Sequence, residues 1–95
     1  MAKVVETPVI WSPRAAEDLI AIRDYIGQDN PLAAQRMAMR LKQAVDSLAA
    51  FPERGRIASR NLRELAFIYP YIIRYRLRGG SVEIVRIKHG AQRPG

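Results

Sequence analysis

Residues 69–90 read YPYIIRYRLRGGSVEIVRIKHG, and this stretch predicts a β-hairpin around which the rest of the chain is organised. Two runs rich in β-branched and aromatic residues flank Gly79-Gly80, and a two-glycine loop supplies the positive φ angles that a tight turn needs. Because strand side chains alternate, this turn puts eight residues on one largely apolar face, in the pairs Leu77–Val82, Tyr75–Ile84, Ile73–Arg86 and Tyr71–Lys88. The other face takes the pairs Arg76–Glu83, Arg74–Val85 and Ile72–Ile87.

The segment before the hairpin predicts two antiparallel helices. Ser12-Pro13 is a serine N-cap followed by a proline at the first helical position, and Asn30-Pro31 repeats the signal after a short connection. Apolar stripes at helical spacing follow both starts, so the helices can share one core. With a β-prone run at Val9–Trp11, residues 1–95 predict a single α+β domain, an N-terminal strand and a helical hairpin packed on a small antiparallel sheet. Residues 52–61 are expected to be a basic loop.

Charge is distributed unevenly along the chain. The net charge is +7, and residues 54–95 hold ten arginine and lysine side chains against two glutamates, whereas residues 1–53 are near neutral. Nine of the ten are arginines, whose planar guanidinium suits phosphate and carboxylate groups. This asymmetry favours a polyanionic target or an acidic protein partner, with simple solubility as the alternative.

Several classes of protein are disfavoured by composition. With no cysteine and one histidine, the usual zinc ligand sets cannot be assembled, and no nucleotide-binding glycine motif is present, so no metal and no cofactor are expected. No apolar run approaches the roughly 20 residues that span a bilayer, and no signal-peptide block opens the chain, so we expect a cytoplasmic protein without a membrane partner.

Two candidate surfaces emerge from the residues alone. Leu32 and Met39 lie off the apolar stripe of their helix, seven residues apart on one side, and suggest a docking surface for a partner, although isolated surface apolar residues are normal. On the β-hairpin, the second face, which carries both apolar and charged residues, suggests a partner surface as well. We therefore assign partner binding to Leu32, Met39, Ile72, Arg76, Val85 and Ile87.

One chemistry remains open, metal-free cleavage of RNA, in which arginines neutralise the phosphate and a side chain moves the proton. Its candidate residues are Arg63, Arg86 and His89. The alternative for His89 is a strand-end histidine satisfied by the backbone, and a lone histidine is weak evidence for catalysis.

Seven fragments, in order, carry a family resemblance. They are WSPRAAEDL (11–19), IRDYI (22–26), NPLAA (30–34), FPERGR (51–56), REL (63–65), YPYIIRY (69–75) and IKHG (87–90). In this order they resemble the RelE/ParE superfamily of toxins from bacterial type II toxin–antitoxin modules, on its ParE side. The resemblance implies a helical hairpin on a small sheet and a cognate ParD-like antitoxin that silences the toxin.

The superfamily divides in function between ribosome-dependent mRNA endonucleases and poisons of DNA gyrase. Here the last tyrosine is Tyr75, Lys88 is the only lysine after Lys42, and Ile72 stands where the nucleases tend to place an arginine, which favours the ParE branch. The resemblance therefore implies a plasmid-stabilisation toxin that inhibits gyrase and is not an enzyme, with a RelE-type nuclease or a non-toxic basic binding module as alternatives. Direct binding of nucleic acid is left open. Target contact is expected at Arg74, Arg86, Lys88, His89 and Arg93.

Overall fold

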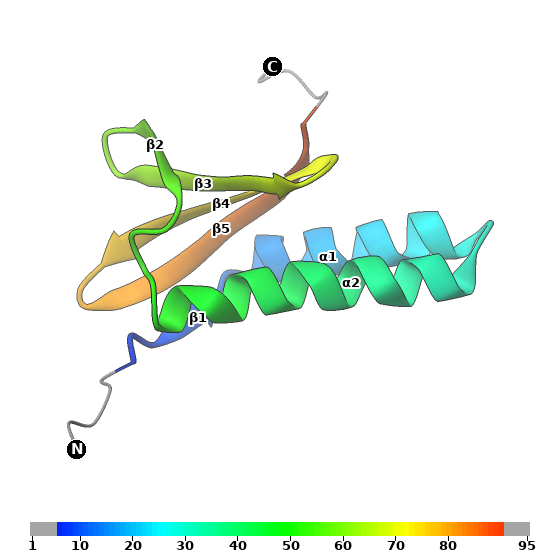
Figure 1. Cartoon of the computed structure of the whole chain (residues 1–95), viewed down its shortest axis with the longest axis horizontal. Coiled ribbons are helices and arrows are strands. Elements are labelled where there is room, and N and C mark those ends of the chain that lie inside the picture. Colours follow the sequence, from blue (N-terminus) through cyan, green and yellow to red (C-terminus); the bar gives the residue numbers. More distant parts are fainter. Residues whose placement is uncertain (1–5, 91–95) are drawn as a thin grey trace.

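Two helices cover one face of a five-stranded sheet in the computed structural model, which describes residues 6–90 (Figure 1). The strand order is β1-β5-β4-β3-β2; β1 runs parallel to β5, and the other neighbours are antiparallel. The predicted α+β class is confirmed, and the parallel edge strand makes the sheet mixed. In chain order the elements are β1 (Val9–Trp11), α1 (Pro13–Gly27), α2 (Pro31–Asp46), the 3-10 helix η1 (Ser47–Ala49), β2 (Arg56–Ser59), β3 (Leu62–Ile68), β4 (Tyr71–Arg78) and β5 (Ser81–His89).

Both helices begin where the sequence predicts. The Ser12 hydroxyl accepts a hydrogen bond from the Ala15 amide at 3.0 Å, and the Asn30 side chain accepts one from the Ala33 amide at 3.0 Å. Each cap satisfies one of the orphan amides of a first helical turn. The two helices run side by side in Figure 1 as the predicted hairpin. Within residues 6–90, no helix is long and apolar enough to cross a membrane.

The β4–β5 hairpin follows the predicted register only for half its length. Gly79 and Gly80 turn with φ of +57° and +78°, and the pairs from the turn to Tyr75–Ile84 are as expected. A β-bulge then leaves Val85 unpaired and shifts the rest of β5 by one residue. The four predicted pairs beyond it are therefore wrong, and the observed ones are Arg74–Arg86, Ile73–Ile87, Ile72–Lys88 and Tyr71–His89.

The helices pack on the largely apolar face of the β4–β5 hairpin. Tyr75, Ile73, Ile84 and Val82 are fully buried there, whereas Leu77 near the turn is partly exposed. Because the bulge shifts the register, Ile87 joins this core, with 3% of its surface exposed. The assignment of Ile87 to a partner surface is therefore wrong.

The segment expected to be a loop contains an edge strand. Arg56–Ser59 forms β2, which pairs with β3. Tyr75 fixes the chain just before it, because its hydroxyl accepts a hydrogen bond from the Gly55 amide (2.7 Å) and donates one to the Pro52 carbonyl (2.8 Å). Burial raises the pKa of Tyr75, and this effect prevails over the Gly55 bond, so the phenol stays protonated and can donate.

Candidate functional site

The sheet face opposite the helices carries arginines that are already paired with acids. Glu64 on β3 lies between Arg74 on β4 and Arg56 on β2, with Arg74 Nη2 at 2.8 Å and Arg56 Nη2 at 3.3 Å from its carboxylate oxygens. Only 8% of Glu64 is exposed. Burial by itself raises the pKa of Glu64, but the hydrogen bonds from Arg74 and then Arg56 outweigh it and leave the pKa lowered.

Two further arginines from β4 and β5 are paired in the same way. Arg76 pairs with Glu83 across the hairpin, as the sequence predicts. Arg86 Nε donates to Asp18 Oδ2 on α1 at 2.8 Å, and the Ile87 amide donates to the same oxygen at 2.9 Å. The hydrogen bond to Asp18 raises the pKa of Arg86. These ion pairs fix the side chains of Arg76 and Arg86 against carboxylates of the same protein.

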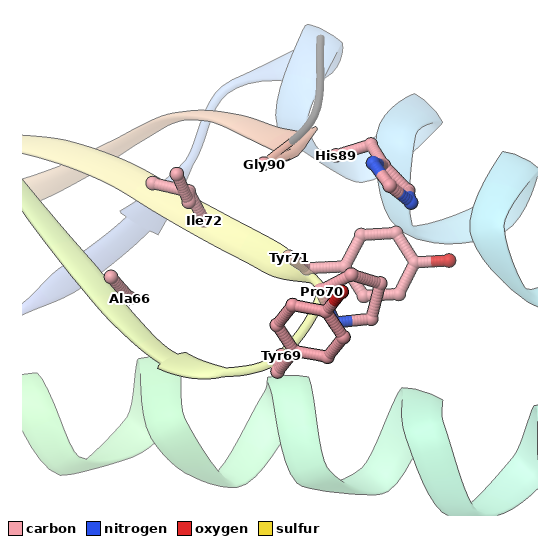
Figure 2. Close-up of a pocket in the computed structure, with 7 residues that line it drawn as sticks. All are labelled: Ala66, Tyr69, Pro70, Tyr71, Ile72, His89 and Gly90. Carbon is pink, nitrogen blue, oxygen red and sulfur yellow. The ribbon is translucent and has the colours of Figure 1, made fainter.

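The far end of the sheet forms a pocket of about 350 Å³, where the turn from β3 to β4 meets the end of β5 (Figure 2). The ring of His89 meets that of Tyr71 edge-on, with centroids 5.6 Å apart and an angle of 82° between the planes. The Gly90 amide donates to the Pro70 carbonyl at 2.6 Å and closes this end, and the Tyr69–Pro70 peptide bond is cis. The lining residues are Ala66, Tyr69, Pro70, Tyr71, Ile72, His89 and Gly90.

The pocket combines one buried and one exposed tyrosine. Tyr71 is 7% exposed, and burial, with a smaller contribution from Tyr25, raises its pKa. At neutral pH Tyr71 is therefore a neutral phenol, which can donate a hydrogen bond and is a poor proton acceptor. Tyr69 is 85% exposed, so its ring is available to a partner.

The three residues assigned to a possible nuclease do not gather at one point. Arg63 lies opposite Tyr75 and His89 opposite Tyr71, four residues apart on β4, which corresponds to about 13 Å along a strand. Arg63 donates to the carbonyls of Glu53 and Gly55 at 3.1 and 2.8 Å. Arg86 is bound to Asp18. No group of three or more potential metal ligands is present within residues 6–90.

The residues assigned to target contact do not form one cluster, and lie on strands β4 and β5 and at the end of the sheet. Lys88 is half-buried opposite Ile72, and His89 is exposed at the pocket. Arg74 and Arg86 are in the ion pairs described above. Arg93 lies outside the described residues.

The residues assigned to partner binding lie on two separate surfaces. Leu32 and Met39 are 55% and 61% exposed on α2. Ile72 and Val85 are half-buried on the sheet, and Arg76 is held by Glu83.

From the sequence, no role is predicted for four exposed aromatic residues. Tyr25, Phe51, Phe67 and Tyr69 are 73%, 64%, 54% and 85% exposed. The Tyr69-Pro70 dipeptide was a usable signal for Tyr69, because a proline turn at a sheet end presents the preceding side chain to solvent.

Comparisons with known proteins point to one family. The sequence model described as "ParE toxin of type II toxin-antitoxin system, parDE" matches residues 9–94. The chain is 63% identical over 84 residues to Toxin RelE2 of Caulobacter vibrioides, covering 88% of this chain and 96% of that relative. It is 42% identical over 84 residues to Putative toxin Y4kP of Sinorhizobium fredii, covering 86% of each. Among solved structures, a chain of the chromosomal ParDE TA system from P. aeruginosa superposes with a TM-score of 0.78 at 26% identity, over 88% of this chain and 96% of that one.

Proposed function

The chain belongs to the ParE toxin family of type II toxin–antitoxin systems, and from this premise we propose that it inhibits DNA gyrase in the cytoplasm until a ParD-like antitoxin covers it. The proposal has two parts, a target contacted by the end of the sheet and an antitoxin that neutralises the toxin. Each part rests on different residues and has its own test.

The pairing of the sheet arginines is the observation that carries a non-nucleolytic function. A nuclease without a metal needs cations free to neutralise the phosphate as charge develops on it. Here Arg56 and Arg74 share Glu64, and Arg86 is bound to Asp18. The protein thus uses these guanidinium groups to bind its own carboxylates. Tyr71, whose pKa is raised, is a poor base. This supports inhibition of a protein target.

The target surface in this proposal is the end of the sheet. Lys88 and His89 supply polar contacts there, and the ring of Tyr69 supplies an exposed apolar anchor beside a pocket. Aromatic anchors next to a pocket are typical of the residues that dominate protein interfaces. Arg74 and Arg86 act in this proposal by positioning the strands that carry these residues.

The antitoxin is proposed to contact Leu32 and Met39 on α2, and Ile72, Val85 and Arg76 on the sheet. Its covering segment should be acidic and apolar, since the described surface combines exposed apolar side chains with a surplus of arginine. The solved relative is a ParDE system, which supports an antitoxin of the ParD type.

A ribosome-dependent nuclease is the second candidate, favoured by the name of the relative Toxin RelE2 and by the contact of His89 with Tyr71. Purified toxin should be added in parallel to gyrase with plasmid DNA and to a translation extract with a defined message. We expect trapped gyrase cleavage complexes and intact message. Message cut at the ribosome with gyrase unaffected would overturn the proposal in favour of the nuclease, and normal growth on induction with neither effect would indicate a non-toxic binding module.

The antitoxin surface has a separate test. Replacing Leu32 and Met39 together by Asp should weaken binding of the antitoxin encoded beside the toxin, measured by titration calorimetry, by at least tenfold, because two buried apolar contacts are lost. Ile20→Asp is the matched control, since Ile20 is 50% exposed on α1 and is not assigned to the interface. Unchanged affinity of the double variant would remove Leu32 and Met39 from the interface.

A further inference from the structure

A second surface, which shares strand β3 with the pocket at the sheet end, combines aromatic rings with arginines. We call it the Phe67 corner and define it by Arg40 on α2, Phe51 and Arg54 after η1, and Phe67 on β3. The guanidinium carbon of Arg54 lies 4.6 Å from the centroid of the Phe67 ring, and Arg54 Nη1 donates to Ser47 Oγ at 2.9 Å. The Arg54 guanidinium thus lies over an aromatic ring, within the range of a cation–π interaction.

Two pockets adjoin at the Phe67 corner, and Arg54 lines both of them. The larger, about 640 Å³, is lined by Phe51, Pro52, Glu53 and Arg54. The smaller, about 250 Å³, is lined by Arg40, Gln43, Ala44, Arg54, Phe67 and Ile68. A ligand long enough to fill both would pass over the stacked pair of Arg54 and Phe67.

The arginines of the corner differ from those of the sheet. Within residues 6–90, neither Arg40 nor Arg54 has a carboxylate within ion-pair distance, whereas Arg56, Arg74 and Arg86 all do. Their charge is therefore available to an anion from outside, next to rings that are half or more exposed.

We propose that the Phe67 corner binds single-stranded DNA, with bases stacked on Phe51 and on the Arg54–Phe67 pair and phosphates bound by Arg40 and Arg54. Exposed aromatic faces beside unpaired arginines are the features by which proteins bind single strands without reading their sequence. An acidic peptide would satisfy the two charges, but only a nucleic acid supplies an aromatic base beside every phosphate to stack on the exposed ring faces.

The Ser47 hydroxyl at this corner has no proton to donate to a ribose. It donates to the Ala44 carbonyl at 2.6 Å and accepts from Arg54. Its proton is therefore committed within the protein and is not available to the 2′-hydroxyl, the group by which proteins distinguish RNA from DNA.

The test measures binding of a fluorescent oligo-dT of about 12 nucleotides, within the usual site size for single strands, to the full chain by anisotropy at low salt. Phe67→Ala and Phe51→Ala should each weaken binding about fivefold or more, because each removes one stacking platform. Tyr25→Ala, the loss of an exposed ring on α1, should change it less than about twofold. Arg54→Gln should weaken binding more than Arg78→Gln, which removes the same charge at the hairpin turn.

Four outcomes would overturn the proposal. They are no binding of oligo-dT, equal losses in the corner and control variants, tighter binding of oligo-U through the same residues, and binding of an alternating Glu-Leu peptide that depends on Phe51 and Phe67 in place of DNA. Thermal unfolding of each variant is the control for folding, and we expect the melting temperature to change little because the replaced side chains are exposed.

Discussion

Asp18 is predicted to be the side chain on which the attachment of α1 to the sheet depends. Its carboxylate accepts hydrogen bonds from Arg86 Nε at 2.8 Å, from Arg86 Nη2 at 3.3 Å and from the Ile87 amide at 2.9 Å. The Asp18 and Arg86 side chains are 13% and 31% exposed. Asp18→Ala therefore leaves a strand amide and a half-buried guanidinium without their acceptor.

The size of the effect follows from these contacts. A buried amide without an acceptor costs about 1–3 kcal/mol. The ion pair adds about 1 kcal/mol, the upper end for exposed pairs, because it is only partly screened by solvent. We expect Asp18→Ala to lower the free energy of unfolding by about 2–4 kcal/mol, which in a domain of this size lowers the melting temperature by roughly 10–25 °C. Arg86→Ala should cost less, about 1–2 kcal/mol, since Asp18 keeps the Ile87 amide.

Urea unfolding measures these differences, and the exposed pair of Lys42 and Asp46 provides the control. Its side chains are 66% and 57% exposed, so Asp46→Ala should change stability by less than about 0.5 kcal/mol. An Asp18→Ala variant no less stable than Asp46→Ala would refute the attachment. Arg86→Ala with normal stability and no toxicity would show instead that Arg86 contacts the target directly.

Three further variants test the segment before β2 and the acid between the arginines. Tyr75→Phe should lower the free energy of unfolding by about 2–3 kcal/mol in urea, because it leaves the buried Gly55 amide without an acceptor; a loss no larger than that of the exposed Tyr25→Phe would contradict this. Gly55→Ala should cost about 1–3 kcal/mol in the same assay, since its Cβ would lie 2.6 Å from the Tyr75 ring, and unchanged stability would show that the loop can move away. The lowered pKa of Glu64 adds to the free energy of unfolding, and this contribution is complete above the ordinary pKa of glutamate and is lost as pH falls through the lowered value. Between about pH 5 and 2 the free energy of unfolding should thus fall less in Glu64→Gln than in the unchanged protein. Parallel plots of this free energy against pH for the two proteins would exclude this role.

The elements that the sequence predicted correctly are those set by local chemistry. Ser12 and Asn30 start the helices because their side chains cap amides three residues ahead, and Gly79-Gly80 forms the turn because both residues adopt positive φ. These interactions lie within a few residues of chain, so pattern and spacing contain them.

The elements that the sequence missed depend on distant contacts. β2 is fully exposed and forms beside β3, with Tyr75, 20 residues away, holding Gly55 in front of it. The partner of Asp18 is 68 residues away, and nothing in the spacing of Arg86 distinguishes a paired guanidinium from a free one. The exposure of Phe51 and Phe67 is likewise a property of the packed chain.

The bulge at Val85 links these local and distant effects, because it determines which side chains at the end of β5 lie on the helix-covered face of the sheet. In an unbroken register Arg86 would share the helix-covered face with Ile73, an arrangement that buries a charge at high cost. The extra residue instead sends Ile87 into the core. It also comes where β1 has ended, so that α1 takes over the edge of β5: the Ser12 hydroxyl donates to the Val85 carbonyl and Asp18 accepts from Arg86 and Ile87. The arginine that resembles a catalytic cation in the sequence therefore joins helix to sheet. In the proposed function, the target contacts Lys88 and His89, which follow this attachment in β5.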